Sequence, residues 1–319
     1  MIGRSAAFQE LVALIAKVAE YNAPVLIEGE TGTGKELAAR AIHYGSSRRD
    51  HPFVPTNCGA IPDALFENEL FGHRRGAFTD ARDDHPGLVA LAHKGTLFLD
   101  EVDALTPKAQ VGLLRFLQDQ QFRPLGGRAE QQVDVRLIAA CNKNLDQLVA
   151  AGQFRSDLLF RLKIMLLRVP PLRERKGDAA LLAEHFVTTG SARFGKDPKP
   201  LHPDSLARLD DHDWPGNVRE LENLVYREFL LADGPSILVG LPVSEAVSPR
   251  LTDEALSYRE AKARAIEAFE RTFLTAVMAR AQGSVALAAR LARTERRHLG
   301  RLLKRYGIER IPTRVTSSG

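Results

Sequence analysis

The sequence predicts an α/β fold with a mostly parallel sheet, followed by a helical lid and then an all-α helix–turn–helix domain. As far as about Pro171, short aliphatic runs alternate with amphipathic segments, which is typical of a parallel sheet covered by helices on both faces. From Arg173 to Asp233 the pattern is wholly helical, and the C-terminal part is basic and helical. We therefore expect an α/β subdomain at 1–172, a lid at 173–233, a linker at 234–257, a helix–turn–helix domain at 258–308 and a tail at 309–319.

Hydrophobic periodicity places the individual elements within this outline. Strands are expected at the aliphatic runs Val25–Glu28, Phe53–Asn57, Thr96–Leu99, Val135–Ala140 and Met165–Val169. Helices are expected at the amphipathic stretches Phe8–Glu20, Gly34–Tyr44, Ala60–Glu69 and Pro107–Gln118. The linker is indicated by its content of Pro, Gly, Ser and Val, and a long amphipathic helix from about Tyr258 to Ala281 is expected after it.

A glycine-rich loop, here called the phosphate loop, follows the first expected strand and precedes a helix. It consists of Gly29, Glu30, Thr31, Gly32, Thr33, Gly34, Lys35 and Glu36. This Gly-x4-Gly-Lys spacing lets backbone N–H groups converge on phosphate oxygens at a helix N-terminus, and the lysine adds a point charge. The loop predicts bound ATP, whereas the alternative is a glycine-rich turn that caps a helix without a ligand.

Two acids end the strand at 96–99 and are the candidates for the chemistry. Asp100 is placed to hold Mg²⁺ through water, and Glu101 is placed to polarise the attacking water. The alternative is that both acids merely begin a helix. Glu36 stands where such loops usually carry Ser or Thr, so Mg²⁺ is expected to depend on phosphates, water and Asp100.

Composition and charge narrow the class of protein. The 319-residue chain has no run long enough to span a membrane and no signal-peptide pattern, so we expect a cytoplasmic protein without membrane association. Cys58 and Cys141 lie in apolar stretches without metal-ligand spacing, which indicates buried free thiols. From Arg250 onward 15 Lys and Arg face 7 Asp and Glu, a net charge of +8, which favours nucleic-acid binding over a merely solvated basic helix.

The most specific motif is Glu-Leu-Phe-Gly-His at 69–73, followed by Gly76, Ala77, Phe78, Thr79, Asp80 and Ala81. Together with the phosphate loop, it resembles the sigma-54-dependent transcription activators, whose ATPase domain is of the AAA+ type. The resemblance implies an AAA+ P-loop parallel sheet with a helical lid, and a loop at 76–81 that contacts the sigma factor. The sequence differs at Asp80, where the family has Gly. The alternative for Phe78 is a side chain folded back into the core.

The same resemblance implies roles for further residues. Asn57 would pair with Glu101 in one nucleotide state, although a local turn is the alternative, and Asn142 would contact the γ-phosphate. Arg155 and Arg161 would act as arginine fingers on a neighbouring subunit, unless they form structural salt bridges. Trans-acting arginines require a homo-oligomer, and the family implies a hexameric ring. Arg219 would reach the nucleotide from the lid.

The C-terminal residues resemble the Fis-type helix–turn–helix domain of these activators. Thr294 is expected to cap the second helix, and the long helix before the motif is expected to form a dimer interface. The candidates for DNA contact are Arg296, Arg297, His298, Arg301, Lys304 and Arg305. A helical dimerisation hairpin with a charged face is the alternative.

These observations predict an ATP-hydrolysing transcription activator that binds upstream enhancer DNA and remodels sigma-54 RNA polymerase. One alternative is a DNA-binding regulator that does not use sigma-54 and keeps a regulatory or vestigial ATPase. Asp80 and Cys141 favour it, because the family has Gly at the first position and usually Thr at the second. The other alternative is a AAA+ remodeller of protein partners without a DNA role. Because the sequence begins close to the ATPase core, we expect either regulation by a separate protein or a trimmed chain starting at Met1.

Overall fold

The computed structural model describes residues 1–79, 81–240 and 266–307, the last range without residues 268, 269, 272, 276, 279, 280, 282 and 293. Most of the expected linker, the start of the long helix at Tyr258 and the tail at 309–319 lie outside the described residues. The chain divides into two compact units, at residues 1–241 and 242–319, and each is described by itself. None of the helices in the described ranges is both long and apolar enough to cross a membrane.

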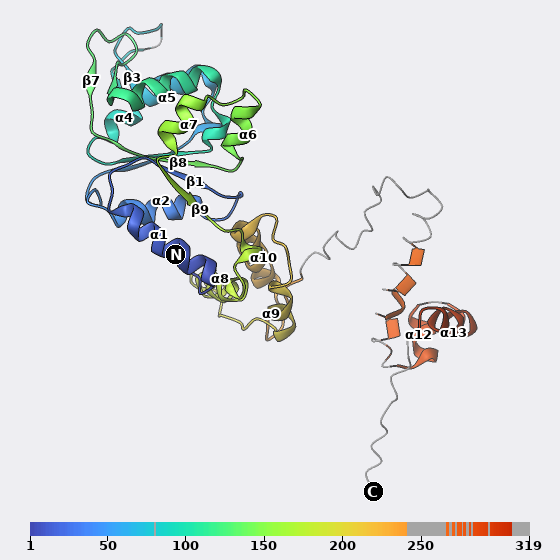
Figure 1. Cartoon of the computed structure of the whole chain (residues 1–319). Helices are drawn as coiled ribbons and strands as arrows, with labels where there is room; N and C mark the ends of the chain where they lie inside the picture. Colours follow the sequence, from blue (N-terminus) through green and yellow to red (C-terminus); the bar gives the residue numbers. More distant parts are fainter. Residues whose placement is uncertain are drawn as a thin grey trace. The chain divides into compact units, whose positions relative to one another are not determined.

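The first unit is built on a parallel sheet of five strands in the order β2-β5-β8-β1-β9 (Figure 1). The strands are β1 (Val25–Glu28), β2 (Phe53–Asn57), β5 (Thr96–Asp100), β8 (Arg136–Cys141) and β9 (Met165–Arg168). All five strands predicted from the sequence are therefore present, with ends that differ by one residue at most. Because every pairing is parallel, all the carboxyl ends meet at one edge of the sheet.

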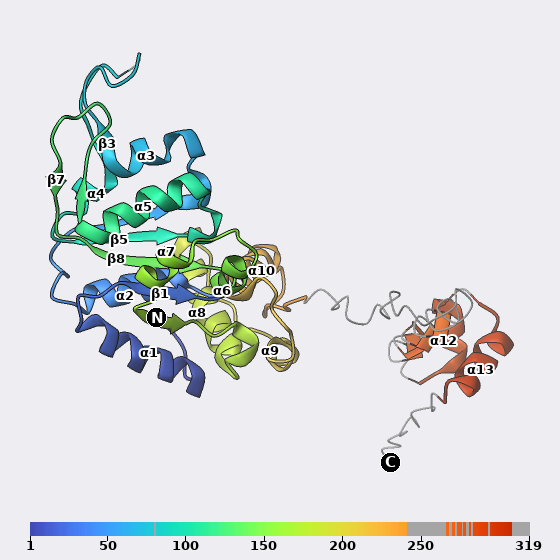
Figure 2. The ribbon, with the colours of Figure 1, turned by 45° about the horizontal axis from the view of Figure 1, so that its top comes forward.

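Helices cover both faces of this sheet, as Figure 2 shows. Helices α1 (Ala6–Ala19) and α2 (Lys35–Tyr44) lie on one face, and the other face carries α3 (Asp63–Phe71), α4 (Leu88–Leu91), α5 (Pro107–Asp119), α6 (Leu145–Ala150) and α7 (Ser156–Leu162). In β1, the side chains of Val25 and Ile27 pack toward α1 and α2, whereas Leu26 packs into the opposite core. This double burial explains why the strands are uninterrupted aliphatic runs.

The helix expected at Ala60–Glu69 begins later than predicted. A short 3₁₀ helix, η1 (Cys58–Ala60), comes first, and α3 starts at Asp63. The reason is local: the side chain of Asn57 caps η1, and Ile61 and Pro62 have extended backbone before α3.

Two small hairpins extend from the α3 side of the sheet. Strand β3 (Gly72–His73) pairs antiparallel with β4 (His85–Pro86), and β6 (Gln121–Phe122) pairs with β7 (Gln131–Gln132). The hairpins lie side by side, because Leu125 N–H donates to the carbonyl of Gly72 and Arg74 N–H donates to the carbonyl of Leu125, both at 2.9 Å.

The lid follows β9 and forms its own core. It contains η3 (Leu172–Glu174), α8 (Asp178–Phe194), α9 (Pro203–Leu209) and α10 (Asn217–Leu231), packed around Trp214 and Phe229. The linker was predicted to begin at 234, but Ile237 and Val239 are fully buried in this core. Residues 234–239 therefore pack as part of the lid, because two apolar side chains in a Pro- and Ser-containing stretch find a buried site there.

The second unit contains α12 (Val285–Leu291) and α13 (Arg296–Arg305). Its core joins Leu274, Val277 and Met278 to buried alanines of α12 and to Leu299 and Leu303 of α13. Leu302 and Tyr306 of the same helix pack against this core and are partly buried, so the 3–4 spacing of these side chains gives α13 one apolar face. The predicted cap is wrong: the N-cap residue of α13 is Glu295, not Thr294, and it makes no side-chain cap hydrogen bond. Thr294 lies one residue earlier, in the turn, where its N–H donates to the carbonyl of Ala289 at 3.0 Å.

Candidate functional site

The phosphate loop lies at the carboxyl end of β1 and leads directly into α2. Gly32 and Gly34 both have left-handed backbone, with φ of 79° and 97°, which explains glycine at these positions. The buried ammonium of Lys35 donates to the loop carbonyls of Gly29 and Glu30, at 2.8 and 3.2 Å. Burial lowers the pKa of Lys35, while the charge of Asp100 opposes that shift.

The two candidate acids lie beside this loop at the end of β5. Asp100 Oδ1 accepts the N–H of Glu101 at 2.9 Å, and burial raises the pKa of Asp100. Glu101 has left-handed backbone with φ of 56° and begins a 3₁₀ helix, η2 (Val102–Ala104), without capping it through its side chain. The carboxylate of Glu101 is therefore not consumed by a helix cap.

Glu36, which stands where such loops usually carry Ser or Thr, pairs with an arginine of its own helix. Its carboxylate accepts two hydrogen bonds from Arg40, at 3.0 and 2.7 Å, on the half-exposed face of α2. Within the described ranges, no group of three or more His, Cys, Asp or Glu could hold a metal ion by itself. A cation at this site would depend on Asp100 together with phosphate and water oxygens.

Asn57 lies close to Glu101, but its side chain makes a local turn, which was the alternative to pairing with Glu101. Its Oδ1 accepts the N–H groups of Gly59 and Ala60, at 2.8 and 3.2 Å. A Cβ on Gly59 would lie 2.6 Å from Glu101 Oε2 and 3.2 Å from Asn57 Oδ1. Both side chains therefore border the same small space, which the missing side chain of Gly59 leaves open.

Sequence reasoning missed Asp103, which connects two parts of the site. Its Oδ1 accepts the backbone N–H of Asn142 at 3.3 Å, so η2 is tied to the end of β8. The side chain of Asn142 is exposed at that end. Beside it, Cys141 is fully buried, and burial raises the pKa of its thiol to about 12.

The three candidate arginines differ in their surroundings. Arg155 donates to both carboxylate oxygens of Asp157, at 3.0 and 2.7 Å, which matches the structural salt bridge considered as an alternative. Arg161 and Arg219 are exposed, and neither side chain forms a hydrogen bond or ion pair within the part of the chain that the structure describes. The side chain of Arg219 starts next to the phosphate loop, since its Cβ would be 3.1 Å from a Cβ on Gly32.

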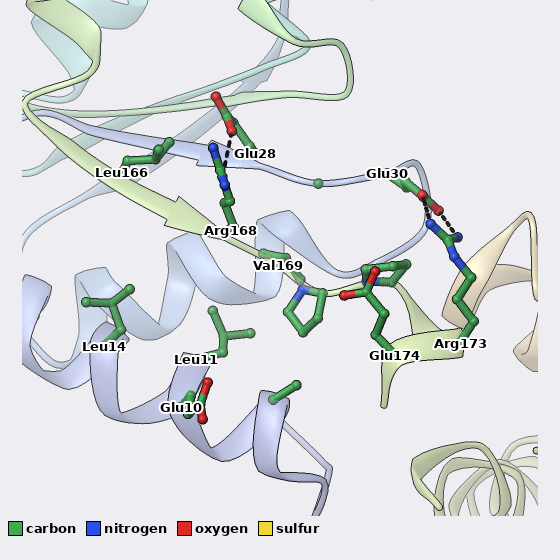
Figure 3. Close-up of a pocket in the computed structure, with 14 residues that line it drawn as sticks. Glu10, Leu11, Leu14, Glu28, Glu30, Leu166, Arg168, Val169, Arg173 and Glu174 are labelled. Atoms are coloured by element: carbon green, nitrogen blue, oxygen red, sulfur yellow. Dashed lines mark hydrogen bonds and ion pairs between the residues drawn. The ribbon is translucent and has the colours of Figure 1, made fainter. Parts of the chain in front are cut away.

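Contacts between the phosphate loop and the lid were also missed. Arg173 donates to both carboxylate oxygens of Glu30, at 2.8 and 2.5 Å, as Figure 3 shows. Asn217 donates to Glu30 and to the carbonyl of Thr31, each at 3.1 Å. A cavity of about 740 Å³ lies beside these residues, between α1 and the ends of β1 and β9. The sequence carries no local sign of these contacts, because the partner residues lie more than 140 positions apart in the chain.

The loop at 76–81 lies at the tip of the β3–β4 hairpin. Phe78 is 45% exposed, and its ring lies 4.9 Å from that of His73, so it is neither in the core nor fully in solvent. The loop closes through Gly76 N–H to the carbonyl of Ala81 and Ala81 N–H to the carbonyl of Phe78, at 2.8 and 3.0 Å. Thr79 is exposed, and Asp80 lies outside the described residues.

In the second unit, the candidate residues for DNA contact share one property. All of them are exposed on α13, opposite its buried leucines; they are Arg296, Arg297, His298, Arg301, Lys304 and Arg305. Residues 296–307 contain no Asp or Glu, so this face of the helix is basic.

A parallel sheet with a phosphate loop after β1, two acids after β5 and a helical lid against the loop defines the class of P-loop nucleotide-binding proteins. Comparison with known proteins identifies the family. The Sigma-54 interaction domain matches residues 1–168, and the AAA+ ATPase lid domain matches residues 173–247. The chain belongs to the sigma-54 interaction domain family.

Individual relatives agree with this assignment. The chain is 42% identical over 309 residues to the nitrogen fixation protein AnfA of Azotobacter vinelandii, covering 97% of this chain and 57% of AnfA. It is 41% identical over 330 residues to the DNA-binding transcriptional regulator NtrC of Escherichia coli K12, covering 97% and 70%. The structure of NtrX from Brucella abortus in complex with ATP superposes with a TM-score of 0.72 at 38% identity, covering 97% of this chain and 69% of NtrX. The chain thus spans between 57% and 70% of the length of these relatives.

Proposed function

We propose that this chain binds ATP with Mg²⁺ at the phosphate loop and hydrolyses it. The observation that carries the proposal is the joint position of Lys35, Asp100 and Glu101 at one edge of the sheet, close enough for Asp100 to influence the pKa of the lysine. The ATP complex of NtrX, a structure with the same fold, supports a nucleotide at this loop.

Each residue has a distinct part in the proposed reaction. Bound triphosphate would attract Lys35 away from the carbonyls of Gly29 and Glu30, because phosphate oxygens carry more charge than carbonyls. Mg²⁺ would neutralise charge on the phosphates while Asp100 orients its water ligands. Glu101 would accept a proton from the attacking water, and its free carboxylate supports that role.

We further propose that hydrolysis drives activation of transcription by RNA polymerase carrying sigma-54. Family membership and the partly exposed Phe78 at a hairpin tip support a loop that contacts the sigma factor. The basic face of α13 supports binding to upstream enhancer DNA, as does similarity to NtrC, a DNA-binding transcriptional regulator. Arg161 acting on a neighbouring site would require a ring, for which a hexamer is the family's form.

One set of experiments tests the whole proposal. Wild-type protein should hydrolyse ATP. It should also form open promoter complexes with sigma-54 polymerase on DNA that carries the upstream site to which the protein binds. Lys35→Ala should lose ATP binding, and Glu101→Gln should bind ATP but lose turnover by roughly 10³-fold or more. Unchanged promoter opening by both variants would show that hydrolysis does not drive activation. If the wild-type protein did not bind sigma-54 and Asp80→Gly did, the result would instead favour a regulator that does not use sigma-54.

A further inference from the structure

Asn217 occupies an unusual place at the first residue of α10. It is fully buried, and its backbone is left-handed with φ of 52°. The Oδ1 atom accepts the N–H of Leu172 at 2.8 Å, and Nδ2 donates to the carbonyl of Thr31 and to Glu30 Oε2, each at 3.1 Å. One amide side chain therefore joins the phosphate loop, the connection from β9 to the lid, and the start of α10.

Neighbouring contacts strengthen this junction. The Arg173 ion pair and the Asn217 hydrogen bond together lower the pKa of Glu30 to about 2. The N–H of Val218 donates to the carbonyl of Gly32 at 3.0 Å, and a Cβ on Gly32 would lie 2.3 Å from the carbonyl oxygen of Gly216. We call Glu30, Thr31, Leu172, Arg173 and Asn217 the loop–lid clasp.

The clasp determines where the backbone and Cβ of Arg219 lie relative to the phosphate loop. Arg219 is two residues after Asn217, on the first turn of α10, and its Cβ lies against Gly32 of the phosphate loop. The guanidinium is exposed and has no protein partner among the described residues. The point from which the Arg219 side chain reaches a ligand on the loop is consequently set by how α10 is attached, and not by contacts of the guanidinium itself.

We propose that Asn217 is a positioning residue that holds the first turn of α10 against the phosphate loop, so that Arg219 meets the phosphates of a bound nucleotide. This inference rests on the proposed binding of ATP at the loop. Without the clasp, the lid would open and close around the loop without bringing Arg219 to one defined place, and the nucleotide would lose a charged partner.

The first experiment needs no nucleotide. Asn217→Gly keeps the left-handed backbone without strain and removes the side chain that makes these hydrogen bonds. Amide hydrogen exchange of the nucleotide-free protein should become about tenfold faster or more at Leu172 and Val218, whose N–H groups belong to the junction. Asn144→Gly, the same change at the exposed N-cap of α6, should leave both amides unchanged. Equal exchange in Asn217→Gly and wild type would overturn the proposal.

The second experiment separates positioning from a general structural role. Asn217→Gly and Arg219→Ala should each raise the KM for ATP about tenfold, and the double variant should be no worse than the poorer single variant. Multiplied losses in the double variant would show that Asn217 does not act through Arg219. If wild-type protein failed to bind ATP, the proposed function would fall, while the exchange measurement would still decide whether the clasp holds the lid.

Discussion

Arg155 and Asp157 form a two-pronged ion pair, with hydrogen bonds of 3.0 and 2.7 Å, whereas Arg161 of the same segment has no partner among the described residues. The pair lies on the surface at the start of α7, and Arg161 lies near the end of that helix. A guanidinium that already binds a carboxylate is a poor candidate for a second anion. We therefore infer that Arg161 is the better candidate for the arginine finger.

Arg161→Ala should lower the kcat of ATP hydrolysis by roughly 10³-fold and leave the Kd for ATP nearly unchanged, because the arginine acts on a neighbour's transition state. Arg155→Ala is the matched comparison and should have a smaller effect. For each variant, steady-state hydrolysis assays measure the kcat and nucleotide-binding assays measure the Kd for ATP.

Mixing inactive subunits provides a control for this prediction. In a random equimolar ring of Arg161→Ala and Glu101→Gln subunits, about a quarter of the interfaces combine an intact Glu101 with an intact Arg161. Activity should therefore return on mixing. If no activity returns although the mixed ring assembles, Arg161 does not act in trans.

Phe78→Ala should abolish binding of sigma-54 and leave ATP hydrolysis within about twofold of wild type, because its half-exposed ring contributes little to the core. Pull-down with purified sigma-54 in the presence of ATP would measure the loss. Tyr21→Ala removes another exposed aromatic and should keep full binding. Normal sigma-54 binding by Phe78→Ala would exclude this residue from the contact.

Gly59→Val should slow hydrolysis by about tenfold with little change in ATP affinity, because its side chain would displace the carboxylate of Glu101. Single-turnover kinetics separate this effect from binding. Gly112→Ala is a suitable control, since a Cβ there would meet Phe71 at an ordinary 3.6 Å. A Gly59→Val enzyme with wild-type turnover would show that the position of Glu101 tolerates this shift.

The two cysteines should resist alkylation in the folded protein. Burial raises the pKa of both thiols to about 12, from an ordinary value of 9.0, so at pH 8 only about one thiol in ten thousand is ionised. Iodoacetamide should label native protein far more slowly than protein unfolded in urea, as mass spectrometry would measure.

The same shifts predict a pH dependence of stability. Because the pKa of each thiol is higher in the folded state, its contribution to the free energy of unfolding is fully present below pH 9 and is lost between pH 9 and 12. Cys58→Ala should make unfolding less sensitive to pH in that window. An unchanged pH profile would indicate that the Cys58 thiolate is tolerated where it lies.

The sequence alone determined the elements and the candidate chemistry. Aliphatic runs marked all five strands of the central sheet, and the Gly-x4-Gly-Lys spacing and the acids after β5 marked the phosphate loop and its partners. These features are readable because they depend on local periodicity and on residues close together in the chain. The loop motif at 69–81 is likewise a continuous segment, and its residues alone indicated the family.

Only the tertiary structure decided which polar groups are engaged. It paired Glu30 with Arg173 and Asn217, tied Asp103 to the end of β8, and distinguished the paired Arg155 from Arg161 and Arg219, which have no partner in the described ranges. It also placed Ile237 and Val239 in the lid core. The physical reason is that burial and hydrogen bonding between segments far apart in the chain depend on how the elements pack, and no local pattern records that packing.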